Sequence, residues 1–288
     1  MTGLSNAQVA QFKDEGFLIV EDAFDGAALE TLQAELSERI DTYARQAQRD
    51  GLLQDRHETS GFHQRLSRLC DQLQDPAPLQ KLVQGKLRTA GMFRILSSCD
   101  LLDIVESVIG PEILAHPQFN ARAKLPYQDA AVVPWHQDLG YLEADAEETF
   151  MVNFWIPLVD ATVENGCMEI ITGSHRTPRI DHADGMGPAG NFKGLDEDQL
   201  PDGVRVMCPV RRGGVVLIQH KTIHRSVPNL SDHIRWSLDL RYSDPRQPTG
   251  RDDVPGFIAR SKADPARVCP SVETWQAIVN EGVVPTGA

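Results

Sequence analysis

The chain has 288 residues, of which 41% are hydrophobic and 24% are charged, and its formal net charge is −13. This acidity disfavours nonspecific binding to nucleic acid or to an anionic membrane surface, although a pocket can still be locally basic. The sequence has no run of eighteen apolar residues and no basic-then-apolar leader, so we expect a soluble, cytoplasmic protein with no membrane partner. The five cysteines show no CxxC spacing, which indicates reduced thiols rather than a disulfide framework or a zinc site.

The first part of the chain carries mainly helical signals. A first helix is expected between Ser5, which can cap it, and Gly16, which ends it. A short apolar strand (17–20) follows, and leucine and isoleucine then repeat at helical spacing through residues 29–40. The polar stretch 45–75 is interpreted as a solvated helix-loop segment in preference to a substrate lid.

After a further amphipathic helix, expected at residues 98–108, the hydrophobic pattern changes to a period of two. In residues 119–124 this period places Asn120, Arg122 and Lys124 on one face of a strand. Such a row of donors is either a solvated face or the lining of a barrel mouth that receives an anion. Position alone favours neither interpretation.

The rest of the sequence indicates strands joined by turns. Asn165-Gly166 is a typical hairpin-turn dipeptide, and residues 176–202 are rich in Gly, Pro and Asp, which predicts a long loop. We expect one domain, with a helical part over about 1–112, a β core over about 113–245 and a tail over 246–288. The expected strands are 149–158, 167–171, 204–208, 214–219 and 236–242, and a short helix is expected at 272–280.

The strongest candidate for a metal site is His136-x-Asp138. On an extended strand, residues two apart project from the same face, so the imidazole and the carboxylate are expected to point the same way. They supply two ligands of a 2-His-1-carboxylate triad, which binds non-heme iron(II) and leaves coordination positions open. A later histidine has to supply the third ligand. Periodicity does not separate His220 from His224, because residues four apart on a strand share a face.

Several motifs occur in a recognisable order. They are His136-x-Asp138, Asn165-Gly166, Gly173-Ser174-His175, Gly213-Gly214, His224-Arg225-Ser226 and Arg235. Their order, over roughly residues 115–242, resembles the phytanoyl-CoA dioxygenase family of iron(II)- and 2-oxoglutarate-dependent oxygenases. The resemblance implies a mainly β fold with flanking helices, the double-stranded β-helix (jelly roll, cupin-like). It also implies that His224 is the third metal ligand and that His220 supports the site. For His175, bracing the hairpin is preferred to binding metal.

The same resemblance assigns a cosubstrate site. The far carboxylate of 2-oxoglutarate needs a cation of fixed geometry, and arginine provides two parallel donors. Arg235 matches the family's residue for this task, and Ser226 is expected to add a hydroxyl donor. The alternative for Arg235 is an ion pair with Asp239 on the same strand face. Further residues expected at the site are Lys124, Asn120 and Trp155 for the cosubstrate, and Arg122, Gln137 and Tyr141 for the substrate.

The expected function is a dioxygenase that uses iron(II), O2 and 2-oxoglutarate to hydroxylate an unactivated C–H bond of a small molecule, with succinate and CO2 as coproducts. Desaturation, epimerisation or cyclisation at the same site stay open, whereas Asp138 disfavours halogenation because halide usually needs that position. Two other classes are considered: a jelly-roll ligand-binding protein that has lost iron, and a cupin-type metal protein that does not use 2-oxoglutarate. Arg235 argues against both. The sequence identifies neither the substrate nor the oligomeric state.

Overall fold

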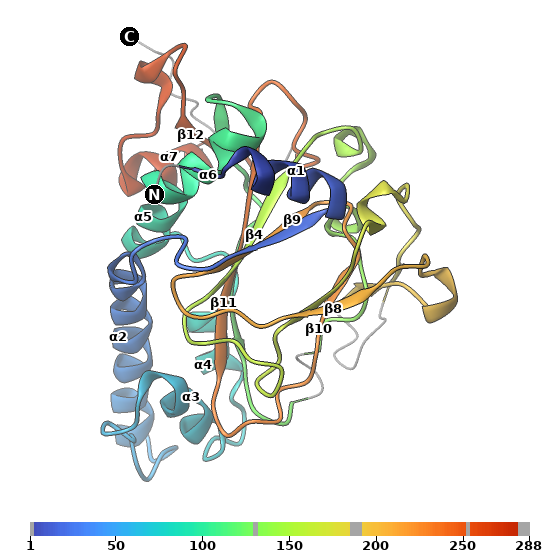
Figure 1. Cartoon of the computed structure of the whole chain (residues 1–288). Coiled ribbons are helices and arrows are strands. Elements are labelled where there is room, and N and C mark those ends of the chain that lie inside the picture. Colours follow the sequence, from blue (N-terminus) through green and yellow to red (C-terminus); the bar gives the residue numbers. More distant parts are fainter. Residues whose placement is uncertain (1–2, 129–131, 185–191, 252–253, 282–288) are drawn as a thin grey trace.

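The computed structural model describes residues 3–128, 132–184, 192–251 and 254–281. Two antiparallel sheets face each other, and helices cover the outer side of the larger one (Figure 1). Within the described residues the larger sheet has seven strands, ordered β1-β9-β4-β11-β2-β12, and β3 also pairs with β11. Their bounds are β1 Phe17–Val20, β9 Val215–Gln219, β4 Val152–Pro157, β11 Arg235–Ser243, β2 Ile113–Ala115, β12 Phe257–Arg260 and β3 Asn120–Lys124.

The smaller sheet has three strands among the described residues, in the order β10-β5-β8. They are β10 His224–Ser226, β5 Met168–Ile171 and β8 Arg205–Cys208. A separate two-stranded ribbon, β6 Ala183–Asp184 with β7 Lys193–Gly194, lies in the predicted long loop. Residues 185–191 of that loop lie outside the described residues.

Local sequence explains where the helices begin and end. Helix α1 (Asn6–Glu15) begins after Ser5, whose Oγ accepts a hydrogen bond from the Gln8 N–H at 3.3 Å, and ends at Gly16, whose φ is 81°. Helix α6 (Cys99–Ile109) ends at Gly110. Both helices were expected from the sequence. The others are α2 Ala27–Arg49, α3 Phe62–Cys70, α4 Ala77–Val83, α5 Ala90–Leu96 and α7 Val272–Glu281.

Strand β11 divides the molecule into an apolar layer and a polar interior. Its even-numbered residues, from Trp236 to Tyr242, are fully buried in the core against the helices. Its odd-numbered residues, which include Arg235, Asp239 and Arg241, face the smaller sheet and line a cavity between the sheets. This alternation is the consequence of the two-residue period of a strand.

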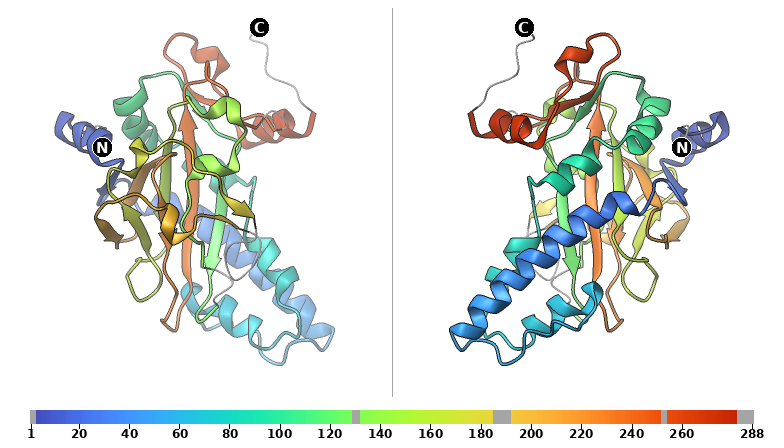
Figure 2. Two further views of the ribbon diagram at one scale, coloured as in Figure 1. Left: turned by 90° about the vertical axis from the view of Figure 1, so that its right-hand side faces the viewer. Right: turned by 90° about the vertical axis from the view of Figure 1, so that its left-hand side faces the viewer.

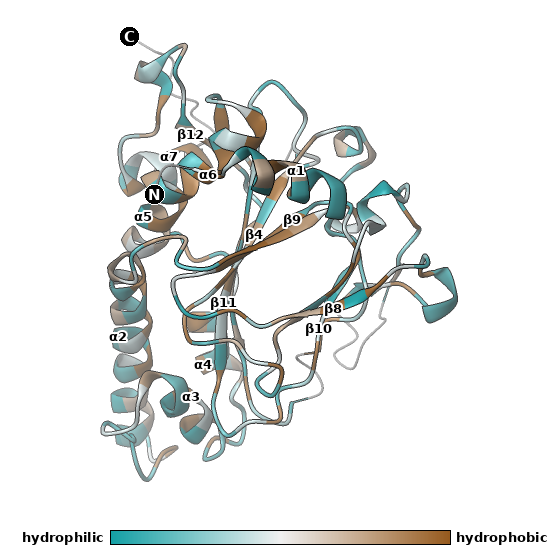
Figure 3. Ribbon diagram, in the orientation of Figure 1, coloured by the Kyte–Doolittle hydropathy of each residue, from teal (hydrophilic) through white to brown (hydrophobic). Residues whose placement is uncertain are grey.

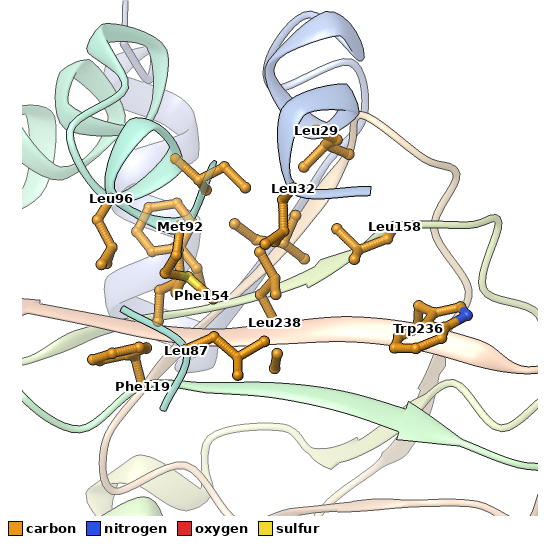
Figure 4. Packing of buried hydrophobic residues seen from close by; sticks show 14 of the residues in the cluster. Leu29, Leu32, Leu87, Met92, Leu96, Phe119, Phe154, Leu158, Trp236 and Leu238 are labelled. Carbon is orange, nitrogen blue, oxygen red and sulfur yellow. The ribbon is translucent and has the colours of Figure 1, made fainter. Parts of the chain in front are cut away.

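Helix α2 crosses the outer face of the larger sheet, as Figure 2 shows from two sides. Its residues Leu29 and Leu32 are fully buried and pack with α5 and with the apolar side of β11 (Figure 4). Burying one such leucine contributes roughly 1.5–3 kcal/mol. In Figure 3 strand β9, which lies between β1 and β4, is hydrophobic along its length. The helices therefore stabilise the sheet whose opposite face carries the polar cavity.

The turn at Asn165-Gly166 differs from the predicted hairpin. Strands β4 and β5, which flank it, do not pair with each other, since β4 lies in the larger sheet and β5 in the smaller. The Asn165 side chain accepts a hydrogen bond from the Thr162 N–H at 2.8 Å, and Gly166 has a φ of 92°. The dipeptide thus makes a tight turn that carries the chain from one sheet to the other, which local turn chemistry does not distinguish from a hairpin.

Helices α4 and α5 and strand β12 were not expected from the sequence. Helices α4 and α5 have seven residues each, which is too short to show a helical period in the sequence. Strand β12 pairs with β2 through an irregular register, and β1 pairs with β9, so the tail and the N-terminal part each add a strand to the larger sheet. No helix among the described residues is long and apolar enough to cross a membrane.

Candidate metal centre

Three side chains converge at one end of the cavity between the sheets. The ligand atoms of His136, Asp138 and His224 lie within 4.8 Å of one another, and they are the group of described residues that could hold a metal ion. His136 and His224 are backbone partners, because each N–H donates to the other's carbonyl at 3.0 Å. Their ring centroids are 4.2 Å apart. The pairing extends the smaller sheet beyond β10 and brings the two imidazoles together.

Asp138 reaches the histidines by a different route from the predicted one. His136 makes only an isolated bridge, and the chain then turns into a short 3-10 helix, η2 (Asp138–Tyr141). The prediction of one extended strand through both residues was therefore wrong. The carboxylate nevertheless lies on the same side as the imidazole, with Asp138 Oδ1 3.8 Å from His136 Nε2.

The two imidazoles are oriented as metal ligands. Nδ1 of His136 lies 2.9 Å from the Pro134 carbonyl, and Nδ1 of His224 lies 2.9 Å from the Thr222 carbonyl. Since a carbonyl oxygen only accepts, both Nδ1 atoms carry the proton, and both Nε2 atoms keep a lone pair for a metal. Burial, assisted by the neighbouring His224, lowers the pKa of His136 to about 3. The ring is therefore neutral, as ligation requires.

The carboxylate of Asp138 is held by two buried side chains. Arg241 Nη2 donates to Oδ1 at 2.6 Å, and Asn153 Nδ2 donates to Oδ2 at 2.5 Å. Burial alone raises the pKa of Asp138, but the Arg241 guanidinium above all, together with the hydrogen bond from Asn153, outweighs it and holds the pKa below its usual range. Two imidazoles whose Nε2 atoms face the site and an ionised carboxylate make the donor set of a facial triad, so these residues fit iron(II).

The structure distinguishes His220 from His224, which the strand period could not separate. Strand β9 ends at Gln219 in the larger sheet, and β10 begins at His224 in the smaller, so the assumption of a shared strand face was wrong. The His220 carbonyl accepts a hydrogen bond from the Leu139 N–H at 3.0 Å, near the beginning of η2. His175 lies elsewhere, with its Nε2 3.1 Å from the Lys13 carbonyl at the end of α1.

A second polar cluster lies further along the same cavity. Arg235 is 3% exposed; its Nε donates to the Gly166 carbonyl at 3.2 Å, and its guanidinium carbon lies 5.0 Å from the centre of the Trp155 ring. Lys124, directly opposite Arg235 on β3, donates from Nζ to Ser226 Oγ at 2.8 Å. Burial lowers the pKa of Arg235 to about 10 and that of Lys124 to about 6.

Neither of these buried cations has an acidic partner within ion-pair distance in the described part of the chain. Asp239, considered as a partner for Arg235, instead forms an ion pair with Arg122. Buried charges are normally paired, because desolvation is costly. An exogenous carboxylate placed between Arg235 and Lys124 would supply the missing anion, which matches the far carboxylate of 2-oxoglutarate.

The remaining predicted site residues have different surroundings. Arg122 lines the cavity, half-exposed, on the same strand face as Lys124. Tyr141 packs edge-on against His136 with ring centroids 5.6 Å apart, and its hydroxyl is bound to the Lys193 backbone. Gln137 is fully buried, and its amide is occupied by backbone groups of residues 178, 180 and 221, so it braces the loop instead of facing a substrate. Asn120 is not among the described residues that line the cavity.

Two contacts of the metal centre were not anticipated from the sequence, namely Arg241 and Asn153. Both had a detectable signal. Asn153 is the one polar residue within the apolar segment 151–158, and Arg241 has the same parity as Arg235 along β11. An isolated amide in a buried strand needs a buried partner, and equal parity predicts a common face.

Comparison with known proteins identifies the family. The profile of the phytanoyl-CoA dioxygenase (PhyH) family matches residues 12–237, which is more than half of the chain. The chain belongs to the phytanoyl-CoA dioxygenase family. It is 27% identical over 260 residues to phytanoyl-CoA dioxygenase domain-containing protein 1 of Rattus norvegicus, covering 82% of this chain and 88% of that protein. It is accordingly a 2-oxoglutarate-dependent oxygenase that uses iron.

Solved structures support the fold of this family member. The non-heme monooxygenase ThoJ superposes with a TM-score of 0.63 at 22% identity, covering 92% of this chain and 87% of that one. EctD from S. alaskensis, solved with 2-oxoglutarate and 5-hydroxyectoine, gives a TM-score of 0.58 at 19% identity, covering 92% and 86%. These likenesses confirm the predicted double-stranded β-helix with flanking helices.

Proposed function

We propose that this protein hydroxylates an unactivated C–H bond of a small molecule and releases succinate and CO2. The observation that carries the proposal is the content of one cavity. It is lined by a 2-His-1-carboxylate group at one end and by Arg235 at the other, where the buried Lys124 lies beside Arg235 on the paired strand and neither has an acidic partner among the described residues. A bidentate 2-oxo acid whose far carboxylate needs a cation satisfies both ends at once.

In this proposal His136, Asp138 and His224 bind iron(II) through both Nε2 atoms and one carboxylate oxygen. Bound iron supplies the activation of O2 and the oxidative decarboxylation of 2-oxoglutarate that drive such hydroxylations. The chain itself supplies two imidazoles with free Nε2 atoms, an ionised carboxylate and a fixed geometry. The carbonyls of Pro134 and Thr222 maintain that geometry by holding both Nδ1 protons.

The far carboxylate of 2-oxoglutarate is assigned to Arg235, Lys124 and Ser226. Trp155 stacks on the guanidinium and forms one wall of the cavity, with apolar Met168 and Ile218 also lining it. These apolar groups exclude water, which strengthens a charge-assisted hydrogen bond between arginine and carboxylate. Asn120 is not required for this arrangement.

The substrate is assigned to the half-exposed part of the same cavity, where Arg122 and Asp239 form an ion pair. Only Nε of Arg122 is used in that pair, so the remaining guanidinium N–H groups are available to an acceptor on a small polar substrate. The related structures include a carbocyclase and an epimerase from nogalamycin biosynthesis, which is a reason to analyse the products for cyclisation and epimerisation as well as hydroxylation.

The first test is an anaerobic titration of the protein with Fe(II) and 2-oxoglutarate, followed by visible absorption. We expect the weak metal-to-ligand charge-transfer band of a bidentate 2-oxo acid on iron(II). The band should disappear in His224→Ala and persist in His175→Ala, a matched control because His175 lies outside the triad and packs on α1.

Substrate screening by succinate release then identifies the reaction. If the wild-type protein binds iron and no band develops, 2-oxoglutarate is not the cosubstrate, and a cupin-type metal protein becomes the better description. If the band forms and the products are desaturated or cyclised, the site assignment stands and the proposal of hydroxylation is wrong.

A further inference from the structure

Asp138 differs from the two histidines in that both of its ligand atoms are engaged by other side chains. Oδ1 accepts from Arg241, whose side chain is 6% exposed, and Oδ2 accepts from Asn153, which is 3% exposed. Arg241 and Asn153 are direct register partners on β11 and β4. Because β4 lies between β9 and β11, the two donors stand on paired central strands of the larger sheet.

Within the described part of the chain, the side-chain hydrogen bonds of Arg241 and Asn153 are directed at Asp138 alone. Arg241 and Asn153 each make one side-chain hydrogen bond among the described residues, and in both cases the partner is Asp138. Their other buried polar atoms, Arg241 Nη1 and Asn153 Oδ1, have no partner in the described structure. Residues that served only to hold the sheet together would be expected to satisfy these atoms within the sheet, since an unpaired buried polar group is costly.

The electrostatics of Arg241 point the same way. A guanidinium next to the carboxylate opposes a divalent cation at the same site by Coulomb repulsion and reduces the charge that the carboxylate offers to it. Arg241 therefore does not serve to tighten metal binding. Beyond keeping the carboxylate of Asp138 ionised, its contribution is geometric.

We infer that Arg241 and Asn153 are positioning residues that restrict Asp138 to binding iron through one oxygen. Oδ1 lies on the side of the histidines, 3.8 Å from His136 Nε2, whereas Oδ2 is turned toward Asn153. For both oxygens to bind the metal, the carboxylate would have to rotate, break the bond to Asn153 and leave a second buried atom of that amide unpaired. A carboxylate bound through one oxygen leaves three coordination positions, enough for a bidentate 2-oxo acid and O2.

This inference rests on the proposed use of iron and 2-oxoglutarate, and it predicts a selective effect. We call Arg241 and Asn153 the clamp on Asp138. Without the clamp, the second oxygen of Asp138 competes with 2-oxoglutarate for a coordination position. Asn153→Ala is therefore expected to bind Fe(II) within threefold of the wild-type affinity, or more tightly. The same variant should bind 2-oxoglutarate at least tenfold more weakly, with a charge-transfer band of changed energy. Arg241→Met is a second variant with the same expectation, in case one of the two fails to fold.

A matched control is available in the helical layer. Arg65 on α3 forms an ion pair with Asp41 on α2 at 2.8 Å, and their side chains are 13% and 21% exposed. Arg65→Met removes a comparable arginine–aspartate pair away from the cavity. It should lower the thermal unfolding temperature of the metal-free protein and leave both the Fe(II) and the 2-oxoglutarate affinities unchanged.

The measurements are anaerobic Fe(II) titrations of the metal-free full-length chain and 2-oxoglutarate titrations of the iron-loaded chain. The inference is overturned if the clamp variants weaken iron binding as much as cosubstrate binding, or if they leave the 2-oxoglutarate affinity and the band unchanged. Failure of the proposed function is detected separately, by the charge-transfer band of the wild-type protein. If the wild-type protein gives no band with iron and 2-oxoglutarate, that function fails, and this inference fails with it.

Discussion

Arg235 on β11 and Lys124 on β3 are opposite each other in the antiparallel register, so a buried guanidinium and a buried amine lie next to each other inside the protein. Protonating Lys124 beside the Arg235 guanidinium in a low-dielectric interior is unfavourable in the absence of an anion. The arrangement becomes favourable when a dicarboxylate enters the cavity. Under the proposed function, the pair is preorganised for the cosubstrate rather than for the stability of the empty fold.

Removing Arg235 should separate cosubstrate binding from metal binding. Arg235→Ala is expected to weaken 2-oxoglutarate binding about a hundredfold or more, because a buried charge-assisted pair is lost. Iron affinity should stay within a few-fold, since Arg235 does not contact the triad. Arg235→Lys should recover only part of the loss, because lysine lacks the planar fork. Unchanged 2-oxoglutarate affinity in Arg235→Ala would refute the cosubstrate assignment.

Lys124 should make cosubstrate binding depend on pH. Burial and the charge of Arg235 lower its pKa to about 6, so in the free protein it is mostly neutral above this pH. A bound carboxylate favours the protonated form, so binding takes up a proton, and the affinity falls as the pH rises from 6 to 8, by up to roughly tenfold per pH unit. Calorimetry in buffers of different ionisation enthalpy measures this proton uptake.

The control for that experiment is Lys124→Met. It should bind 2-oxoglutarate more weakly than the wild type at pH 6, and its affinity should change little between pH 6 and 8. An equally steep pH dependence in Lys124→Met would show that another group is responsible.

Gly166 should be intolerant of a side chain. Its φ is 92°, and an added Cβ would lie 2.7 Å from the Val227 carbonyl oxygen and 3.0 Å from Lys124 Cδ. Gly166→Ala is therefore expected to cost about 1–3 kcal/mol of unfolding free energy and to weaken 2-oxoglutarate binding by displacing Lys124. Gly51→Ala is the control, since Gly51 also has a positive φ (75°) but has nothing within 4 Å of the added atom. It should cost about 1 kcal/mol and leave binding intact.

The helical layer should affect stability without affecting the site. Leu32 on α2 is fully buried, so Leu32→Ala is expected to cost about 2–5 kcal/mol in denaturant unfolding. The 2-oxoglutarate affinity of the folded, iron-loaded fraction should not change, because the cavity lies on the other face of the sheet. Leu52→Ala, at a position that is 58% exposed, should cost less than about 0.5 kcal/mol. A specific loss of cosubstrate binding in Leu32→Ala would contradict this separation.

Local sequence was sufficient for many single elements. Ser5 and Gly16 delimit α1 because an N-cap hydroxyl and a left-handed glycine act on neighbouring backbone groups. The two-residue period placed Arg122 with Lys124 and Arg235 with Asp239 on common faces. In the structure Arg122, Arg235 and Asp239 line the cavity, and Lys124 lies opposite Arg235 on β3. The order of short motifs was sufficient to indicate the family.

What the sequence could not determine is which elements meet. The strand period assigns His220 and His224 to the same face, so it does not separate their roles. Their roles differ because the chain passes from the larger sheet to the smaller sheet between them. For the same reason Asn165-Gly166 connects two sheets instead of two paired strands, and Arg241 and Asn153, 88 positions apart in number, meet on Asp138. Caps and strand periods arise from interactions between neighbours in the chain, which any local stretch of sequence records. The partners of a carboxylate or a buried cation are chosen by the packing of distant strands, and that choice exists only in the folded protein.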